Sequence, residues 1–327
     1  PFAAGANLAT KLMRQQLQSL DPAERQLVRR LADDATLAST AEFTALPAAR
    51  QHLVANIAYA WLRDRAVHQP PSAATARQSF ALLQLINDSA APGQMPPVAP
   101  QPTAPQDGHR TGLLALGAGQ EEARSYADVE WRLSYHDLLD PVAGYPVGSS
   151  LNMGRLVARL KEGGTLQLQQ FDLLEITSLS PRDEFFQPWT WRVNAGWDRQ
   201  WTDGDDVLTT QVNAGFGWTF APAESLSLFG LVTGRLEYNH ALEQELDVAP
   251  GLAVGARLDS QLGTTLLSTD YYQFTDGVER ARYALRHNLP LGTNLALRLH
   301  AQRQVTDTDR VDEVGIVDAI VTDQAAG

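Results

Sequence analysis

The segment from Tyr135 to Asp140 places a histidine beside two carboxylates. His136 is followed by Asp137 and Asp140, and Gly144 lies just downstream, where a strand must end. A histidine with two carboxylates can bind a metal ion, whereas short acidic side chains in a turn accept backbone N–H bonds. We predict that the segment forms a structural corner at a strand end, and a metal or ligand site is the alternative.

Other patterns that support catalysis are weak or missing from the sequence. Gly117-Ala118-Gly119 is a lone G-x-G without the third glycine of a dinucleotide site, and no P-loop, HExxH or G-x-S-x-G occurs. The chain has no cysteine, which excludes a disulfide framework, a thiolate zinc site and a cysteine nucleophile within it. We predict no catalytic, cofactor-binding or metal-binding residue, so the sequence favours a non-catalytic chain.

The histidines show no metal-ligand spacing. They are His52, His68, His109, His136, His240, His287 and His300. Of these, His136 and His300 fall on the polar faces of predicted strands. We interpret both as solvated or hydrogen-bonded structural residues, and a functional role inside a lumen is the alternative.

After about residue 110, the apolar residues change from helical spacing to strict alternation. In residues 211–220, Phe216 and Trp218 fall on one face of a strand, and Gln211 and Asn213 fall on the other. Successive side chains of a strand point to opposite faces. The pattern therefore places every second side chain in an apolar medium and its neighbours in a polar one.

The alternation recurs in about twelve strand candidates from Thr111 onward. Turn signals separate them at Gly163-Gly164, Asp203-Gly204-Asp205, Pro222, Asp276-Gly277 and Pro290-Leu291-Gly292. The spacing is about 15 residues per strand and turn, which is longer than in β-sandwiches. We predict a mainly β chain with a closed, antiparallel, up-and-down β-barrel of about twelve strands.

The polar face of these strands indicates which side of the barrel is wet. It is rich in Arg, Asp, Gln, Asn and His, and twelve strands with an apolar interior would enclose a large void. Such a face suits a lumen that contains water or a plug, with lipid outside. We predict an outer-membrane barrel, and a soluble barrel or two-layer sheet is the alternative. The chain ends without the aromatic residue that commonly closes outer-membrane strands.

The first part of the chain has helical periodicity. Residues 6–90 contain four amphipathic segments, with starts at Asp21-Pro22, near Pro47 and near Ser72. Residues 91–110 are rich in proline, which favours an extended linker or strap. We predict a helical domain at 1–90, a linker at 91–110 and the barrel at 111–327. The net charge of −12 argues against nucleic acid as a partner.

Several short motifs occur in a characteristic order. They are the proline stretch before Gly108-His109-Arg110, then Gly117-Ala118-Gly119, Tyr135-His136-Asp137-Leu138-Leu139-Asp140, Gly144-Tyr145, Gly148, Ser178-Leu179-Ser180-Pro181-Arg182 and Pro188-Trp189-Thr190-Trp191. Together they resemble the C-terminal region of bacterial DUF4105 or Lnb-like proteins, which is a helical segment followed by a DUF7840-like barrel. The resemblance implies that a cysteine-dependent acyltransferase domain lies outside this chain. We interpret Pro1 as the start of a processed or truncated product.

Three functional hypotheses follow. In the first, a non-catalytic outer-membrane barrel with a periplasmic helical domain anchors or positions the acyl-transfer domain that the resemblance implies. In the second, the barrel is a pore for small solutes. In the third, a soluble β-domain binds lipid or lipoprotein. The expected partners are outer-membrane lipid and, in the first hypothesis, lipoproteins or a preceding catalytic domain.

Overall fold

The computed structural model describes residues 12–67, 70–89, 108–141, 145, 147–202, 205–240, 245–307 and 309–322. The chain forms two compact units, Pro1–Pro102 and Thr103–Gly327. Most of the predicted proline linker lies outside the described residues, so its conformation and the three predicted domain boundaries stay predictions. None of the described helices is both long and apolar enough to cross a bilayer.

The helical unit is built from amphipathic helices. Residues 12–18 are helical, and the following elements are α2 (Pro22–Asp33), η1 (Ala35–Ser39), α3 (Ala41–Thr44), α4 (Ala48–Ala66) and α5 (Ala73–Ser89). Leu27 and Leu31 of α2, Val54 and Ile57 of α4 and Leu82 of α5 are all buried. Their helical spacing forms the apolar stripes that pack against one another.

The start of α2 follows the predicted capping pattern. The Asp21 side chain accepts a bond from the Glu24 backbone N–H at 2.8 Å, and the Glu24 side chain accepts one from the Asp21 N–H at 3.0 Å. This reciprocal pair satisfies two free N–H groups of the first turn. The helix starts predicted near Pro47 and Ser72 also agree with α4 and α5. The short η1 and α3 were not predicted, because four or five residues are too few to show a helical period.

Twelve long strands form the second unit, as predicted. They are β1 (Gly112–Glu121), β2 (Arg124–His136), β3 (Ser149–Lys161), β4 (Leu166–Ser178), β6 (Thr190–Thr202), β7 (Asp205–Ala223), β8 (Leu226–Tyr238), β9 (Leu246–Ser260), β10 (Gly263–Gln273), β11 (Glu279–Gly292), β12 (Leu295–Thr306) and β13 (Arg310–Thr322). The two-residue β5 (Pro181–Arg182) adds a short parallel pairing to β7.

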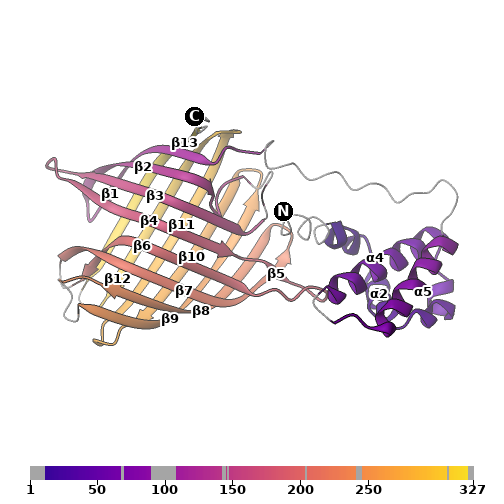
Figure 1. Cartoon of the computed structure of the whole chain (residues 1–327). Coiled ribbons are helices and arrows are strands. Elements are labelled where there is room, and N and C mark those ends of the chain that lie inside the picture. The colour runs from indigo at the N-terminus through magenta and orange to yellow at the C-terminus, as the bar shows by residue number, and fades with distance from the viewer. Residues whose placement is uncertain are drawn as a thin grey trace. The chain divides into compact units, whose positions relative to one another are not determined.

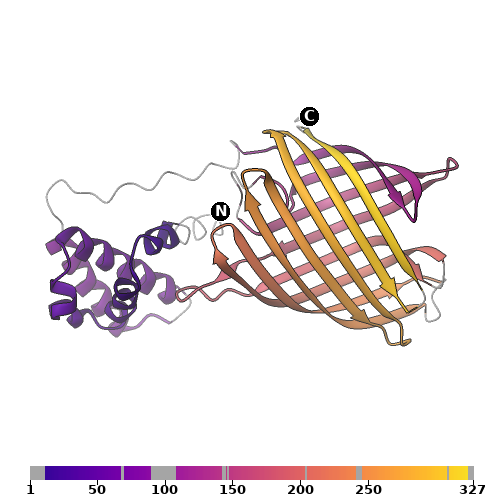
Figure 2. The same ribbon diagram turned by 180° about the vertical axis from the view of Figure 1, so that it is seen from behind.

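The strands close into a ring. Each long strand pairs antiparallel with its neighbours in sequence, β7 pairs with β8, and β1 closes the ring by pairing with β13 from Gly112↔Thr322 to Glu121↔Glu313. The strands run obliquely around the barrel (Figures 1 and 2), as closure of a twisted sheet requires. The predicted up-and-down barrel of about twelve strands is confirmed.

Two of the predicted turn signals lie inside strands. Pro222 belongs to β7, and the turn follows at residues 224–225; Pro290 belongs to β11, and the turn follows at residues 293–294. The pairing register shifts beside both, between Phe220 and Ala223 and between Pro290 and Gly292. Proline is tolerated there because an irregular pairing needs no ladder N–H.

The two faces of the barrel are opposite in character to those of a soluble domain. On the outer face, Phe216, Val232 and Leu252 are 58%, 56% and 55% exposed. On the inner face, Arg132 and Asp172 are fully buried. The alternation predicted from sequence is therefore real, and the apolar set points outward. The apolar interior that the soluble alternative requires is not found in the described part of this barrel.

Candidate functional site

Many charged side chains of the barrel point into its lumen. Strand alternation directs Arg132 of β2, Arg257 of β9 and Arg298 of β12 inward. Burying such groups is favourable only when each guanidinium finds acceptors. The partners of these arginines therefore define what the lumen can do.

The predicted corner supplies acceptors for two of them. We call residues 137–140 the lumen turn. The Asp137 carboxylate accepts the backbone N–H groups of Leu139 at 2.8 Å and Asp140 at 3.0 Å, and the Asp140 carboxylate accepts the N–H of Asp137 at 2.9 Å. These are the local bonds that short acidic side chains make in turns. They fix both carboxylates in place.

Two arginines from different strands bind the same pair of carboxylates. Arg132 donates to Asp137 at 3.2 Å and to Asp140 at 2.9 Å. Arg298 donates to Asp137 at 2.7 Å and also to Asp140. Burial of Asp137 would raise its pKa, but the positive charges of Arg298 and Arg132 outweigh burial and hold that pKa well below its usual range. Asp137 is therefore negatively charged at neutral pH, and the lumen turn is clamped between β2 and β12.

A third arginine ties the lumen turn to the opposite wall. The Arg257 Nε donates to the backbone carbonyl of Leu138 at 3.0 Å. β9, which carries Arg257, lies six strands from β2 in either direction around the ring. The turn thus extends across the lumen. The predicted corner lies at the end of β2, and it also contacts the opposite wall of the barrel, which sequence reasoning did not anticipate.

Three other residues of the predicted motif form an aromatic stack beside the lumen turn. The ring centroids of Tyr145 lie 4.5 Å from His109 and 4.3 Å from His136. The Tyr145 hydroxyl donates to the His109 carbonyl at 3.1 Å, and the His136 Nε2 is 3.0 Å from the Ser149 Oγ. The stack joins the residues before β1 to the β2–β3 connection.

The remaining motif residues have simpler positions. Gly108 precedes His109, and the backbone N–H of Arg110 donates to the Asn294 side chain at 3.2 Å. Tyr135 lies in β2, and Gly144 lies outside the described residues. Within the described part of the chain, no group of three or more His, Cys, Asp or Glu residues is placed to hold a metal. The geometry of the motif is thus that of a packed, ion-paired element.

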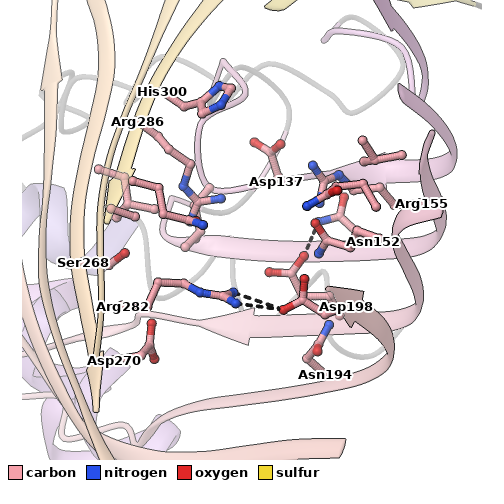
Figure 3. A pocket seen from close by; sticks show the side chains of 18 of the residues that line it. Asp137, Asn152, Arg155, Asn194, Asp198, Ser268, Asp270, Arg282, Arg286 and His300 are labelled. Atoms are coloured by element: carbon pink, nitrogen blue, oxygen red, sulfur yellow. Dashed lines mark hydrogen bonds and ion pairs between the residues drawn. The ribbon is translucent and has the colours of Figure 1, made fainter. Parts of the chain in front are cut away.

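More interactions cross the lumen away from the turn. Arg282 of β11 binds Asp198 of β6 at 3.1 Å (Figure 3), and these strands are five apart around the ring. Gln304 of β12 donates to the Trp201 carbonyl of β6 at 3.0 Å, across six strands. Both contacts lie near the end of the barrel opposite the lumen turn. Side chains therefore bridge the lumen at both ends.

An aromatic–arginine pair fills the wall near that second end. Arg159 of β3 lies 3.5 Å above the Tyr126 ring and binds Asp128 at 2.9 Å. The Tyr126 hydroxyl donates to Glu313 of β13 at 2.8 Å. A Cβ added at Gly119 would lie 2.4 Å from the Tyr126 hydroxyl. Gly119 of the G-x-G noted in the sequence thus makes room for this ring.

A polar cavity of about 360 Å³ remains inside the barrel. Its lining includes nine arginines and seven acidic residues, an excess of two positive charges, although the whole chain carries a net charge of −12. Figure 3 shows side chains from opposite walls pointing into this space. The cavity can hold water or a small polar ligand.

The decisive lumen arginines were not singled out by sequence reasoning. The alternation placed Arg132 and Arg298 on polar faces, so their inward direction could be predicted. Their shared partners could not be predicted. Arg298 and Asp137 are 161 residues apart in the chain, and a contact between them depends on the number of strands in the barrel and on the pairing register. Arg257 had no sequence signal beyond its place in an alternating strand.

Residues 102–317 match the family described as Domain of unknown function (DUF7840). The chain belongs to the DUF7840 family. This match covers the DUF7840 part of the resemblance seen in the sequence, and the link to DUF4105 or Lnb-like proteins remains a proposal. No curated protein matches the DUF7840 chain.

The DUF7840 chain is also similar to solved barrel structures. The NanC porin is 8% identical over 64% of this chain and 99% of that chain, with a TM-score of 0.39. The KdgM porin with disordered oligogalacturonate is 7% identical over 63% and 98%, with a TM-score of 0.36. A loop L8 deletion mutant of OmpT from Vibrio cholerae is 9% identical over 64% and 97%, with a TM-score of 0.32.

Proposed function

We propose that this DUF7840 chain is a non-catalytic outer-membrane anchor, whose barrel spans the bilayer with a bridged lumen and holds the helical unit at the membrane. The observation that carries the proposal is the inverted distribution of its faces. On every long strand of the barrel, large apolar side chains among the described residues point outward, and ion-paired polar side chains line the inside. This arrangement is stable where lipid surrounds the barrel.

The outer face is too apolar and too continuous for water. Neighbouring strands β7, β8 and β9 place Phe216, Val232 and Leu252 on one surface, each more than half exposed. Soluble monomers rarely expose apolar patches larger than a few hundred Å². A surrounding lipid bilayer removes the free-energy cost of exposing this face to water, because moving apolar surface out of water is favourable by about 25 cal/mol per Å².

Aromatic side chains at a strand end support the same placement. Trp189, just before β6, stacks on Trp218 of β7 with ring centroids 5.8 Å apart. Both side chains point outward and are about half exposed. Tryptophan favours the interface between lipid and water. The pair therefore supports one boundary of the membrane at this end of the barrel.

Two features support anchoring over free diffusion through the barrel. The lumen turn is tied to β2, β9 and β12, and a second set of contacts bridges the other end.

The second feature is the topology of the barrel. The first residue of β1 pairs with the last of β13, so the chain enters and leaves the barrel at one end. A folded helical unit that precedes the barrel stays on the side from which the barrel inserts, since carrying its polar surface through lipid is costly. We place that unit in the periplasm, where it can position a preceding DUF4105-like domain.

A pore for small solutes is the second candidate, and the cavity favours it. Its charged lining could select among small ions once the bridging contacts open.

Membrane flotation with the intact chain tests the anchor: we expect the protein to float with lipid vesicles after a carbonate wash. Protein that stays monodisperse in the soluble fraction without detergent would contradict a membrane barrel.

Planar bilayers separate the two candidates. The anchor predicts that inserted protein leaves the bilayer without a steady conductance, because the bridging ion pairs persist. Stepwise, long-lived conductance would favour the pore. Protease treatment of intact and permeabilised cells locates the helical unit, which we expect to be cleaved only after permeabilisation.

A further inference from the structure

One arginine that lines the cavity differs from the other described arginines there. Of the nine arginines that line the cavity, eight bind a carboxylate within the barrel; Arg286 of β11 makes no ion pair or hydrogen bond with any described residue. Figure 3 shows its side chain directed into the cavity. An uncompensated guanidinium inside a barrel keeps its charge only by facing water or an anion.

The neighbours of Arg286 do not supply that anion. His300 lies opposite it in the β11–β12 register, but the His300 Nε2 is 3.3 Å from Glu313 and 3.1 Å from the Tyr126 hydroxyl. Leu266 lies opposite it on the β10 side and is apolar. The positive charge therefore remains available to a molecule in the cavity.

Two carboxylates are near enough to interact with Arg286 through space. Asp137 is already held by Arg132 and Arg298. Glu175 projects from β4, six strands away around the ring, and accepts a bond from the Asn152 side chain at 3.0 Å. Glu175 faces the cavity without reaching Arg286. Among the described residues, the site thus has one unpaired guanidinium on one wall and the Glu175 carboxyl group on the other.

We propose that Arg286 binds a small, singly charged carboxylate in the lumen. The guanidinium fork matches a carboxylate with two parallel N–H bonds. The cavity volume of about 360 Å³ is roughly tenfold the 30 Å³ that one water occupies in the liquid.

Calorimetric titration of the intact chain in micelles with sodium acetate, at constant ionic strength, tests this site. We expect saturable binding, a loss of at least tenfold in affinity for Arg286→Gln, and partial retention for Arg286→Lys, which keeps the charge without the fork. Arg303→Gln is the matched control, because Arg303 pairs with Asp312 and is exposed outside the cavity. It should bind acetate as the wild type does.

Thermal unfolding of the variants shows whether a loss of acetate binding results from misfolding. Arg286 has no partner among the described residues, so Arg286→Gln should unfold at a temperature no lower than the wild type. Absence of saturable acetate binding by folded wild type, or equal binding by folded Arg286→Gln, would overturn the proposal. The site does not depend on the anchoring function, since a barrel that failed to float with lipid could still bind acetate in micelles.

Discussion

At the scale of single residues, the lumen turn has a sequence of the kind found in surface turns, but it lies inside the barrel. Asp137 and Asp140 were expected to make turn hydrogen bonds, and they do. The same carboxylates also neutralise Arg132, which is fully buried. A buried arginine without such partners would cost several kcal/mol. The local sequence predicts the hydrogen bonds of the turn. The arginines of the barrel walls give its carboxylates a second role, which is to neutralise buried positive charge.

The acid response of the barrel should depend on Asp137. Its pKa in the folded barrel is lowered, mainly because Arg298 and Arg132 outweigh burial. A carboxyl with a lowered folded pKa stabilises the fold above its unfolded pKa of about 3.9, and this contribution disappears as the pH falls through the folded pKa. We expect Asp137→Asn to lower stability at pH 7 by about 1–3 kcal/mol and to flatten the loss of stability below pH 4. Urea unfolding of the barrel between pH 2 and 7 measures both effects. An unchanged acid limb would contradict the arginine clamp.

At the scale of elements, the cap of α2 links local sequence to packing in the helical unit. Glu24 is nearly buried, accepts the Asp21 N–H and binds Arg50 of α4. The hydrogen bond from Arg50 is the main cause that lowers the pKa of Glu24. One side chain therefore both closes the capping box and ties α2 to α4.

Glu24→Gln should weaken the helical unit. The amide keeps an acceptor for the cap but loses the charge that binds Arg50, so we expect a loss of about 1–2 kcal/mol at pH 7. Because the lowered pKa makes this contribution vanish in acid, the variant and wild type should converge as the pH falls below about 4. Thermal unfolding followed at 222 nm measures the difference. Glu42→Gln is the control, since its exposed pair with Arg30 contributes little.

Close strand packing gives a second test at this scale. A Cβ at Gly217 of β7 would lie 1.9 Å from the Gly230 carbonyl and 2.7 Å from the Leu231 Cα, whereas a Cβ at Gly230 would meet only a Val254 methyl at 4.0 Å. Gly217→Ala should therefore destabilise the barrel by about 1–3 kcal/mol, and Gly230→Ala should not. Refolding yields and heat-dependent gel migration compare them. Similar behaviour of the two variants would show that the wall can relax.

The elements were more predictable than their contacts. Period-two alternation in β7 and the capping pattern at Asp21 are local signals, so strands and helix starts could be read from neighbouring residues. Pro222 was wrongly predicted to mark a turn. A register shift between β7 and β8 accommodates it, and such a shift is a property of two paired strands that cannot be predicted from one strand alone. That Arg286 has no partner among the described residues could not be predicted either, because it depends on which acids the other walls direct toward it.

At the scale of the whole barrel, membrane placement makes the outer face sensitive to depth. Val232 lies at the centre of β8 and is 56% exposed on the outer face, whereas Tyr238 ends the same strand and is 40% exposed on that face. Lipid penalises a buried charge most at the midplane. Water would treat both positions alike.

Arginine at these two positions therefore tests the membrane barrel with one strand. Val232→Arg should cost about 2–4 kcal/mol of folding free energy in a bilayer, and Tyr238→Arg about 0–1 kcal/mol. Reversible urea unfolding in lipid vesicles, followed by tryptophan fluorescence, gives both values. The inner face offers a further comparison, because Thr233 beside Val232 points into the lumen. Equal and small costs at Val232 and Tyr238 would mean that the outer face lies in water, and the apolar surface on β7, β8 and β9 would then need a protein partner in place of lipid.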